Sequence, residues 1–385
     1  MKQLLLRLKR FCGYLAGFVF FISGILKLMD PVGSSLVMKE YFQFLHIGFM
    51  DFSATTAGVI FALAETIIGA GLITGVWRKI IACISIGLQG FFTLLTLLLV
   101  IFQPKMDCGC FGEAVHLSHG ETFGKNLILL TLLLIYYIPA KHLGETKKKK
   151  YVSFGIVCLS VAAFCLYSLL YIPMTDFTDL HPGVIINSAP QTAENTYEAV
   201  FVYEKDGQTA EFTLDNLPDS TWTYVSTLTT GNDTQTPSAA NISIYDQDGN
   251  YADSLLTQGR IIIASFYNDD ISQKQLDRTK AFLAQAQAAG FTPVLLTVSG
   301  TLDLPYHYFC DYKTLITLNR SNGGATYVDN GSIIRKWSKR TLPDPEDLTT
   351  MSEEDSTETF IGRDAKTGLA FQGFLLYVFA VMLLL

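Results

Sequence analysis

Charged residues are scarce in this sequence of 385 residues. Asp, Glu, Lys and Arg make up 16% of it and hydrophobic residues 49%, whereas soluble globular proteins carry about a quarter of charged residues. The sequence also lacks a glycine-rich phosphate loop, a Ser/His/Asp arrangement and a zinc-ligand spacing. These absences argue against nucleotide-dependent, hydrolytic and zinc-dependent enzymes, and we expect no metal site.

The few charges are divided unevenly along the chain. Residues 174–366 hold 27 acidic and 13 basic residues, a formal charge of −14, and the remainder holds 8 acidic and 15 basic residues, a charge of +7, which together give the net −7. An acidic soluble part next to a basic apolar part predicts separate soluble and membrane segments. Nucleic acid is not an expected partner, because binding phosphates requires clustered Lys and Arg.

Long apolar runs are the main feature of the sequence. A helix needs about 20 apolar residues to cross a bilayer, and six stretches meet or approach that length. We expect all six to lie in the lipid bilayer: residues 11–29, 52–76, 80–102, 123–138, 152–172 and 368–385. The fourth and the sixth stretches are short.

Basic residues orient these spans, because cytoplasmic loops are rich in Lys and Arg. Eleven basic residues fall on one side: Lys2, Arg7, Lys9, Arg10, Arg78, Lys79, Lys141, Lys147, Lys148, Lys149 and Lys150. We therefore predict a bacterial inner-membrane protein with a cytoplasmic N-terminus and with residues 30–51, 103–122 and 174–366 in the periplasm. A cleaved signal peptide is disfavoured, because the first run is long and no clear cleavage site follows it.

Three polar residues lie within or beside the spans. Glu65 and Gln89 fall near the middle of the second and third stretches, and Lys27 lies at the outer end of the first. A carboxylate at mid-membrane is costly unless it is paired, hydrated or protonated. We expect Glu65 to face the bundle interior with Gln89 as its partner and Lys27 to reach the interface. A structural polar contact and a functional site are both consistent with this pattern.

Cys108 and Cys110 flank Gly109 in a loop predicted to face an oxidising compartment. A disulfide between cysteines one residue apart closes a tight ring, and strained, exposed disulfides are the ones that exchange readily. The pattern thus favours a redox-active pair. A static disulfide is the alternative, and metal ligation is weaker, since only His116 and His119 lie nearby.

Three segments carry a family resemblance: residues 20–31, residues 64–71, and above all Cys108-Gly109-Cys110-Phe111-Gly112. With them, residues 1–145 resemble the DoxX-like/MauE (methylamine-utilisation) membrane family. The resemblance implies a four-helix membrane bundle. MauE-type proteins are linked to maturation of a disulfide-rich periplasmic enzyme, and DoxX relatives to quinone-dependent sulfur oxidation, so the resemblance names a quinone as a cofactor.

The rest of the chain adds five segments. They are a fifth transmembrane helix (146–173), a β-rich periplasmic segment (174–240), an α/β domain (241–342), an acidic linker (343–367) and a sixth transmembrane helix (368–385). In the β-rich segment, alternating runs at 197–203 and 209–214 on either side of Asp206-Gly207 predict a β-hairpin. The order strand, helix, strand, hairpin in 241–342 resembles a thioredoxin-like domain of the TlpA type. Residues 267–272, where a thioredoxin has Cys-x-x-Cys, contain no cysteine, so we expect a degenerate domain. The layout resembles proteins of the Bacteroidota.

Two functions follow. The first is periplasmic thiol–disulfide exchange or protein maturation through Cys108 and Cys110, with a periplasmic or membrane protein as partner. The alternative is a non-enzymatic scaffold whose degenerate domain binds a periplasmic partner. A transporter built on Glu65 ranks last, because the sequence shows no inverted repeat.

Overall fold

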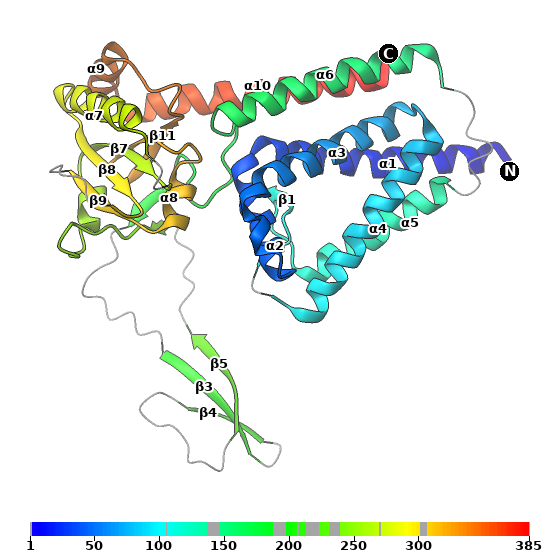
Figure 1. The fold of residues 1–385 in the computed structure, drawn as a ribbon, viewed down its shortest axis with the longest axis horizontal. Helices are drawn as coiled ribbons and strands as arrows, with labels where there is room; N and C mark the ends of the chain where they lie inside the picture. Colours follow the sequence, from blue (N-terminus) through cyan, green and yellow to red (C-terminus); the bar gives the residue numbers. More distant parts are fainter. Residues whose placement is uncertain are drawn as a thin grey trace.

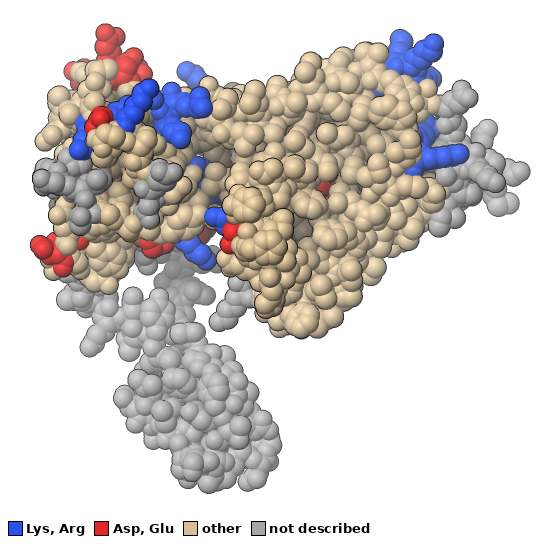
Figure 2. Space-filling view, viewed as in Figure 1, with Lys and Arg blue, Asp and Glu red and all other residues tan. Residues whose placement is uncertain are grey.

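The computed structural model describes residues 2–104, 106–137, 146–187, 198–205, 208–212, 223–230, 239–268, 271–300 and 306–384. Figure 1 shows a helical part, which holds both chain ends, and a part built on a β-sheet beside it. In Figure 2 the helical part is mostly uncharged on the visible face, with basic residues gathered near the chain ends. The sheet part carries most of the visible acidic residues.

A bundle of four helices forms the first part of the chain: α1 (Lys2–Met29), α3 (Ala54–Thr74), α4 (Arg78–Phe102) and α5 (His119–Tyr137). Between α1 and α3 lie α2 (Pro31–Phe44) and η1 (Gly48–Ser53), and the short strand β1 (Cys110–Glu113) lies between α4 and α5. We call α1 to α5 with these connections the membrane bundle.

Within the described residues, five helices are long and apolar enough to cross a membrane: Leu6–Met29, Gly48–Thr74, Arg78–Phe102, Lys148–Leu170 and Ser356–Leu384. They coincide with five of the six predicted spans, and the chain is a membrane protein. The remaining prediction, residues 123–138, corresponds to α5. This helix packs on α4 and α1 but is not among the five, because it is short and begins with polar residues.

Small residues let α1 and α3 approach closely. A Cβ atom added at Gly69 would lie 2.5 Å from the Phe21 backbone nitrogen, and one added at Gly24 would lie 2.2 Å from Thr66 Oγ1. In lipid, helices associate mainly through such close packing, because apolar surface gains nothing by leaving lipid tails. This contact fixes which residues of α1 and α3 face each other.

Two further helices, α6 (Lys148–Leu170) and α10 (Ser356–Leu384), run side by side (Figure 1). Phe164 stacks on Phe374 at 4.8 Å between ring centroids, and Lys150 Nζ donates to the Met382 carbonyl at 2.9 Å. The helices are therefore antiparallel. The acidic stretch expected as a linker is instead largely helical. Asp344 accepts from the Asp347 backbone nitrogen and caps α9 (Pro345–Glu353), and α10 already begins at Ser356.

The chain between α6 and α10 contains a seven-stranded mixed sheet in the order β6-β2-β11-β10-β7-β8-β9. We call this part of the chain the sheet domain. Strands β7, β8 and β9 are parallel, and β10 is antiparallel to both β7 and β11. Helix α7 (Gln273–Ala288) connects β7 to β8 and α8 (Tyr312–Leu318) connects β9 to β10. The strands are β2 (Ile185–Asn187), β6 (Ala239–Asn241), β7 (Arg260–Phe266), β8 (Thr292–Thr297), β9 (His307–Phe309), β10 (Gly324–Asp329) and β11 (Ser332–Trp337).

A separate three-stranded sheet has the order β4-β3-β5. Strand β3 (Glu198–Lys205) pairs antiparallel with both β4 (Gln208–Phe212) and β5 (Thr223–Thr230). The hairpin predicted in the β-rich segment is thus confirmed. Its predicted turn, Asp206-Gly207, lies outside the described residues.

Candidate functional site

The Cys-Gly-Cys loop lies against the membrane bundle and is held there by its backbone. Tyr41 Oη of α2 donates to the Cys108 carbonyl at 2.9 Å, and Ser23 Oγ of α1 donates to the Cys110 carbonyl at 2.7 Å. Gly109 has φ +59°, and a Cβ atom there would lie 2.3 Å from Val37 Cγ1. Only glycine suits this position, since an L side chain would be both strained and overlapping. We call residues 104–119 the thiol loop.

Cys108 is paired with a histidine. Its Sγ lies 3.0 Å from His119 Nδ1, and His119 Nε2 lies 3.0 Å from the Pro104 carbonyl oxygen. A carbonyl can only accept, so Nε2 carries a hydrogen and Nδ1 of the neutral ring is left to accept from the thiol. Burial raises the pKa of the Cys108 thiol. In the reduced form of the pair, this sulfur is therefore a protonated thiol with a base in place to take its proton.

The sequence analysis missed this role of His119. It counted His116 and His119 only as candidate metal ligands. His119 is the first residue of α5, and the fold of the thiol loop brings it back to Cys108. Within the segments that the structure describes, no group of three His, Cys, Asp or Glu residues could hold a metal ion.

Glu65 is paired with Lys27. Lys27 Nζ lies 2.7 Å from Oε1 and 2.8 Å from Oε2 of Glu65, and Ser23 Oγ lies 2.9 Å from Oε2. The expected partner, Gln89, instead donates to the Asn126 carbonyl at 3.1 Å. Lys27 does not extend to the interface as expected, because close packing of α1 on α3 places its ammonium beside the carboxylate. The pair offsets the cost of burying either charge alone.

A cavity of about 390 Å³ joins these groups. Its wall includes both thiol-loop cysteines and all three predicted polar residues, Lys27, Glu65 and Gln89. Most of the remaining wall is apolar. Phe61 and Phe91 both line the cavity, and their ring planes are nearly parallel with centroids 6.3 Å apart. Sites for small ligands are typically apolar clefts of about 300–1,000 Å³ with a few placed polar groups. These residues fit a lipid-soluble quinone, whose ring is flat and whose oxygens accept hydrogen bonds.

The other cysteines lie apart from the thiol loop. All seven are free thiols. Cys310 is buried in the sheet domain, where burial raises the pKa of its thiol to about 12. Such a thiol is almost fully protonated at neutral pH and unsuited to exchange. Cys158 and Cys165 lie on α6 and Cys12 on α1, within candidate spans, and Cys83 lies on α4.

Fold and site together define a membrane protein with a thiol pair at the wall of an apolar cavity. Residues 3–139 match the family model described as Methylamine utilisation protein MauE. This range spans the membrane bundle and includes the thiol loop, so the bundle is similar to MauE proteins. Residues 197–230 match a model described as a domain of unknown function, DUF8463, which covers β3 to β5. Comparison with curated proteins and with solved structures gives no match.

Proposed function

We propose that the protein is a membrane component of thiol–disulfide exchange in which Cys108 and Cys110 form the redox pair. The observation that carries this proposal is the 3.0 Å contact between Cys108 Sγ and His119 Nδ1, with Nε2 anchored on Pro104. A thiol beside a fixed imidazole is the arrangement that activates cysteine for nucleophilic attack. The MauE match covers Cys108 and His119, and we propose a role in protein maturation rather than in handling methylamine itself.

The two cysteines have different exposure, which assigns their order in the reaction. Cys110 is half-buried and Cys108 is buried, so a client thiolate attacks Cys110 Sγ of the Cys108–Cys110 disulfide. A client–Cys110 disulfide forms, and Cys108 leaves and takes up the proton that the first client thiol gave to His119. The second client thiol then attacks the client sulfur, forms the client disulfide and releases Cys110, which takes up the proton of that second thiol. The client loses two electrons and two protons, and the pair gains them.

A lipid-soluble quinone is the proposed acceptor for regenerating the disulfide. When bound, it would supply the capacity to take up two electrons and two protons. Phe61, Phe91 and Phe92 would hold its ring in the cavity, and Lys27, whose ammonium has three hydrogens and which also lines the cavity, would donate a hydrogen bond to one of its oxygens. His119, whose Nδ1 lies 3.0 Å from Cys108 Sγ, would take the proton from this sulfur and return it.

The sheet domain is proposed to be thioredoxin-like and to recognise the client. The order β11-β10-β7-β8, with α7 joining β7 to β8 and β10 antiparallel to its neighbours, supports that arrangement. Residues 267–272, directly after β7, contain no cysteine, which favours binding over catalysis by this domain. The same observation supports the alternative function, a scaffold without redox chemistry. We place the protein in a bacterial inner membrane with the sheet domain in the periplasm.

The redox state of Cys108 and Cys110 in intact cells tests the exchange. Differential alkylation and mass spectrometry before, during and after a pulse of reductant should find the pair oxidised, then reduced, then reoxidised within minutes. Cys108→Ser should trap a mixed disulfide between Cys110 and a client. A pair that stays reduced or stays oxidised throughout, with no trapped client, would remove the redox function and leave the scaffold.

A further inference from the structure

Arg320 of the sheet domain is buried against the membrane bundle. It lies between α8 and β10, and its side chain is 4% exposed. Its Nε lies 2.9 Å from Asp30 Oδ2 and its Nη2 lies 2.9 Å from Glu113 Oε1, while Nη1 donates to the Ile316 carbonyl at 3.1 Å. One guanidinium from the sheet domain thus binds two carboxylates of the bundle. A planar guanidinium is suited to such a fixed double contact.

Both carboxylates belong to segments that hold the thiols. Glu113 is the last residue of β1, the strand that begins with Cys110. Asp30 caps α2 by accepting from the Gly33 backbone nitrogen at 2.9 Å, and α2 carries Tyr41, which binds the Cys108 carbonyl. Packing here is close, since a Cβ atom at Gly33 would lie 2.5 Å from Asp30 Oδ2 and 3.1 Å from Glu113 Cγ. Arg320 therefore ties the sheet domain to both sides of the Cys-Gly-Cys turn.

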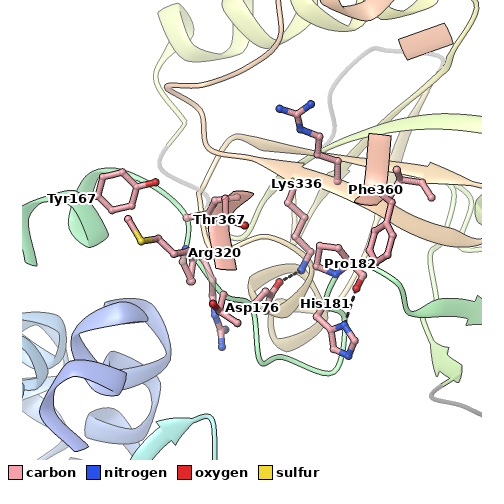
Figure 3. A pocket seen from close by; sticks show the side chains of 14 residues that line it. Tyr167, Asp176, His181, Pro182, Arg320, Lys336, Phe360 and Thr367 are labelled. Carbon is pink, nitrogen blue, oxygen red and sulfur yellow. Dashed lines mark hydrogen bonds and ion pairs between the residues drawn. The ribbon is translucent and has the colours of Figure 1, made fainter. Parts of the chain in front are cut away.

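A second buried ion pair lies close by and joins residues on the sheet-domain side. Lys336 Nζ lies 2.6 Å from Asp176 Oδ2 and also donates to the Thr317 carbonyl at 3.3 Å. Figure 3 shows this pair beside Arg320, at the junction between the sheet domain and the helices. Both of its members belong to the sheet-domain side. The Lys336–Asp176 pair is therefore a matched control for the Arg320 contacts.

The edge of the sheet domain that docks on the bundle is also informative. Tyr267, which directly follows β7, donates from Oη to the Arg320 carbonyl at 3.2 Å. The carboxyl end of this strand is where a thioredoxin would hold its cysteines. In this chain residues 267–272 at the corresponding edge contain no cysteine, and this edge faces the thiol loop of the membrane bundle.

We propose that Arg320 is a positioning residue through which the docked sheet domain fixes the Cys110 strand and so controls the reactivity of the membrane thiols. The inference rests on the proposed function for its biological meaning. In physical terms, the inference states that the Arg320 contacts limit how exposed and how mobile Cys110 is. Loss of the guanidinium leaves Asp30 and Glu113 buried as two like charges without a partner, which pushes the α2 cap and β1 apart. The Cys110 strand then moves away from the bundle.

Alkylation of Cys110 in the purified, reduced full-length protein tests this inference. Arg320→Gln should speed maleimide labelling of Cys110 at least fivefold, and Glu113→Gln should also speed it. The double variant should label no faster than the faster single variant, because both changes break one interaction. Arg320→Lys keeps the positive charge but loses the planar group that binds both carboxylates at once. Its labelling rate should lie between those of wild type and Arg320→Gln.

The control variant is Lys336→Gln, which breaks the neighbouring pair and should leave the Cys110 rate within twofold of wild type. Thermal melting of each variant separates unfolding from a local change. The inference is overturned if Arg320→Gln labels like wild type, or if Lys336→Gln speeds labelling equally. Labelling does not require a redox cycle. A response to Arg320→Gln in a protein whose thiols never cycle in cells would therefore remove the proposed function and leave Arg320 as a positioning residue.

Discussion

His119 is the residue on which the reactivity of Cys108 depends most directly. Because burial raises the pKa of the Cys108 thiol, little thiolate exists at neutral pH without a base. We expect His119→Gln to slow exchange at pH 7 on the order of a hundredfold, the usual contribution of a positioned base. The rate of the variant should then rise tenfold per pH unit as hydroxide forms the thiolate, up to the raised pKa. Exchange with a model disulfide, followed from pH 6 to pH 10, measures both effects.

The neighbouring histidine provides the control for this experiment. His116 is more than half exposed and lies 3.6 Å from Asp107, so His116→Gln should keep the wild-type rate and pH profile. Cys310, with its pKa of about 12, should stay unlabelled until the protein is denatured. If His119→Gln reproduced the wild-type profile, the imidazole would have no part in the chemistry.

At the scale of single residues, the sequence identifies the thiols but not their partners. Cys108 and Cys110 stand out because their spacing is visible along the chain. The contact between Cys108 and His119 depends on how eleven residues fold, and a residue pattern does not contain that path. The pairing of Glu65 was wrong for a similar reason, since the rotation of α1 on α3, and not depth in the membrane, selects Lys27 over Gln89.

The cavity depends on the packing of helix α1 against helix α3. At Gly69 an added methyl would overlap backbone atoms of α1, which cannot rotate away. We expect Gly69→Ala to destabilise the bundle by about 1–3 kcal/mol, the usual cost of overpacking. Gly90→Ala on α4, where no atom lies within 4 Å of the added methyl, should be neutral or slightly stabilising. The temperature of thermal aggregation in detergent measures the stability of both variants. Equal temperatures for the two would contradict close packing at Gly69 as a source of stability.

Regular elements were predictable where a run of apolar residues or a turn signal was long enough. Five spans, the hairpin of β3 and β4, and helix α7 follow from such patterns. The helices within 343–367 were missed because their composition is acidic. The Asp344–Pro345 pair at the start of α9 was a local capping signal that could have identified the first of them. Composition alone does not distinguish a solvated linker from a solvated helix.

On the scale of the whole molecule, the thiol loop and the sheet domain must lie on one side of the membrane, because Arg320 joins them. The chain ends and the start of α6 lie together at the other end of the helical part (Figure 1). The excess of Lys and Arg near those ends predicts that they lie in the cytoplasm. Cysteines introduced at two exposed positions, Asp248→Cys in the sheet domain and Lys149→Cys at the start of α6, test this orientation.

In spheroplasts a membrane-impermeant maleimide should label Asp248→Cys at once and Lys149→Cys only after lysis. Because a sheet domain in the cytoplasm would also place Cys108 and Cys110 there, the reverse pattern would put the thiols in a reducing compartment. Oxidative exchange with secreted clients would then be ruled out together with the orientation. The labelling pattern of two surface positions therefore decides whether the thiol chemistry has a suitable compartment.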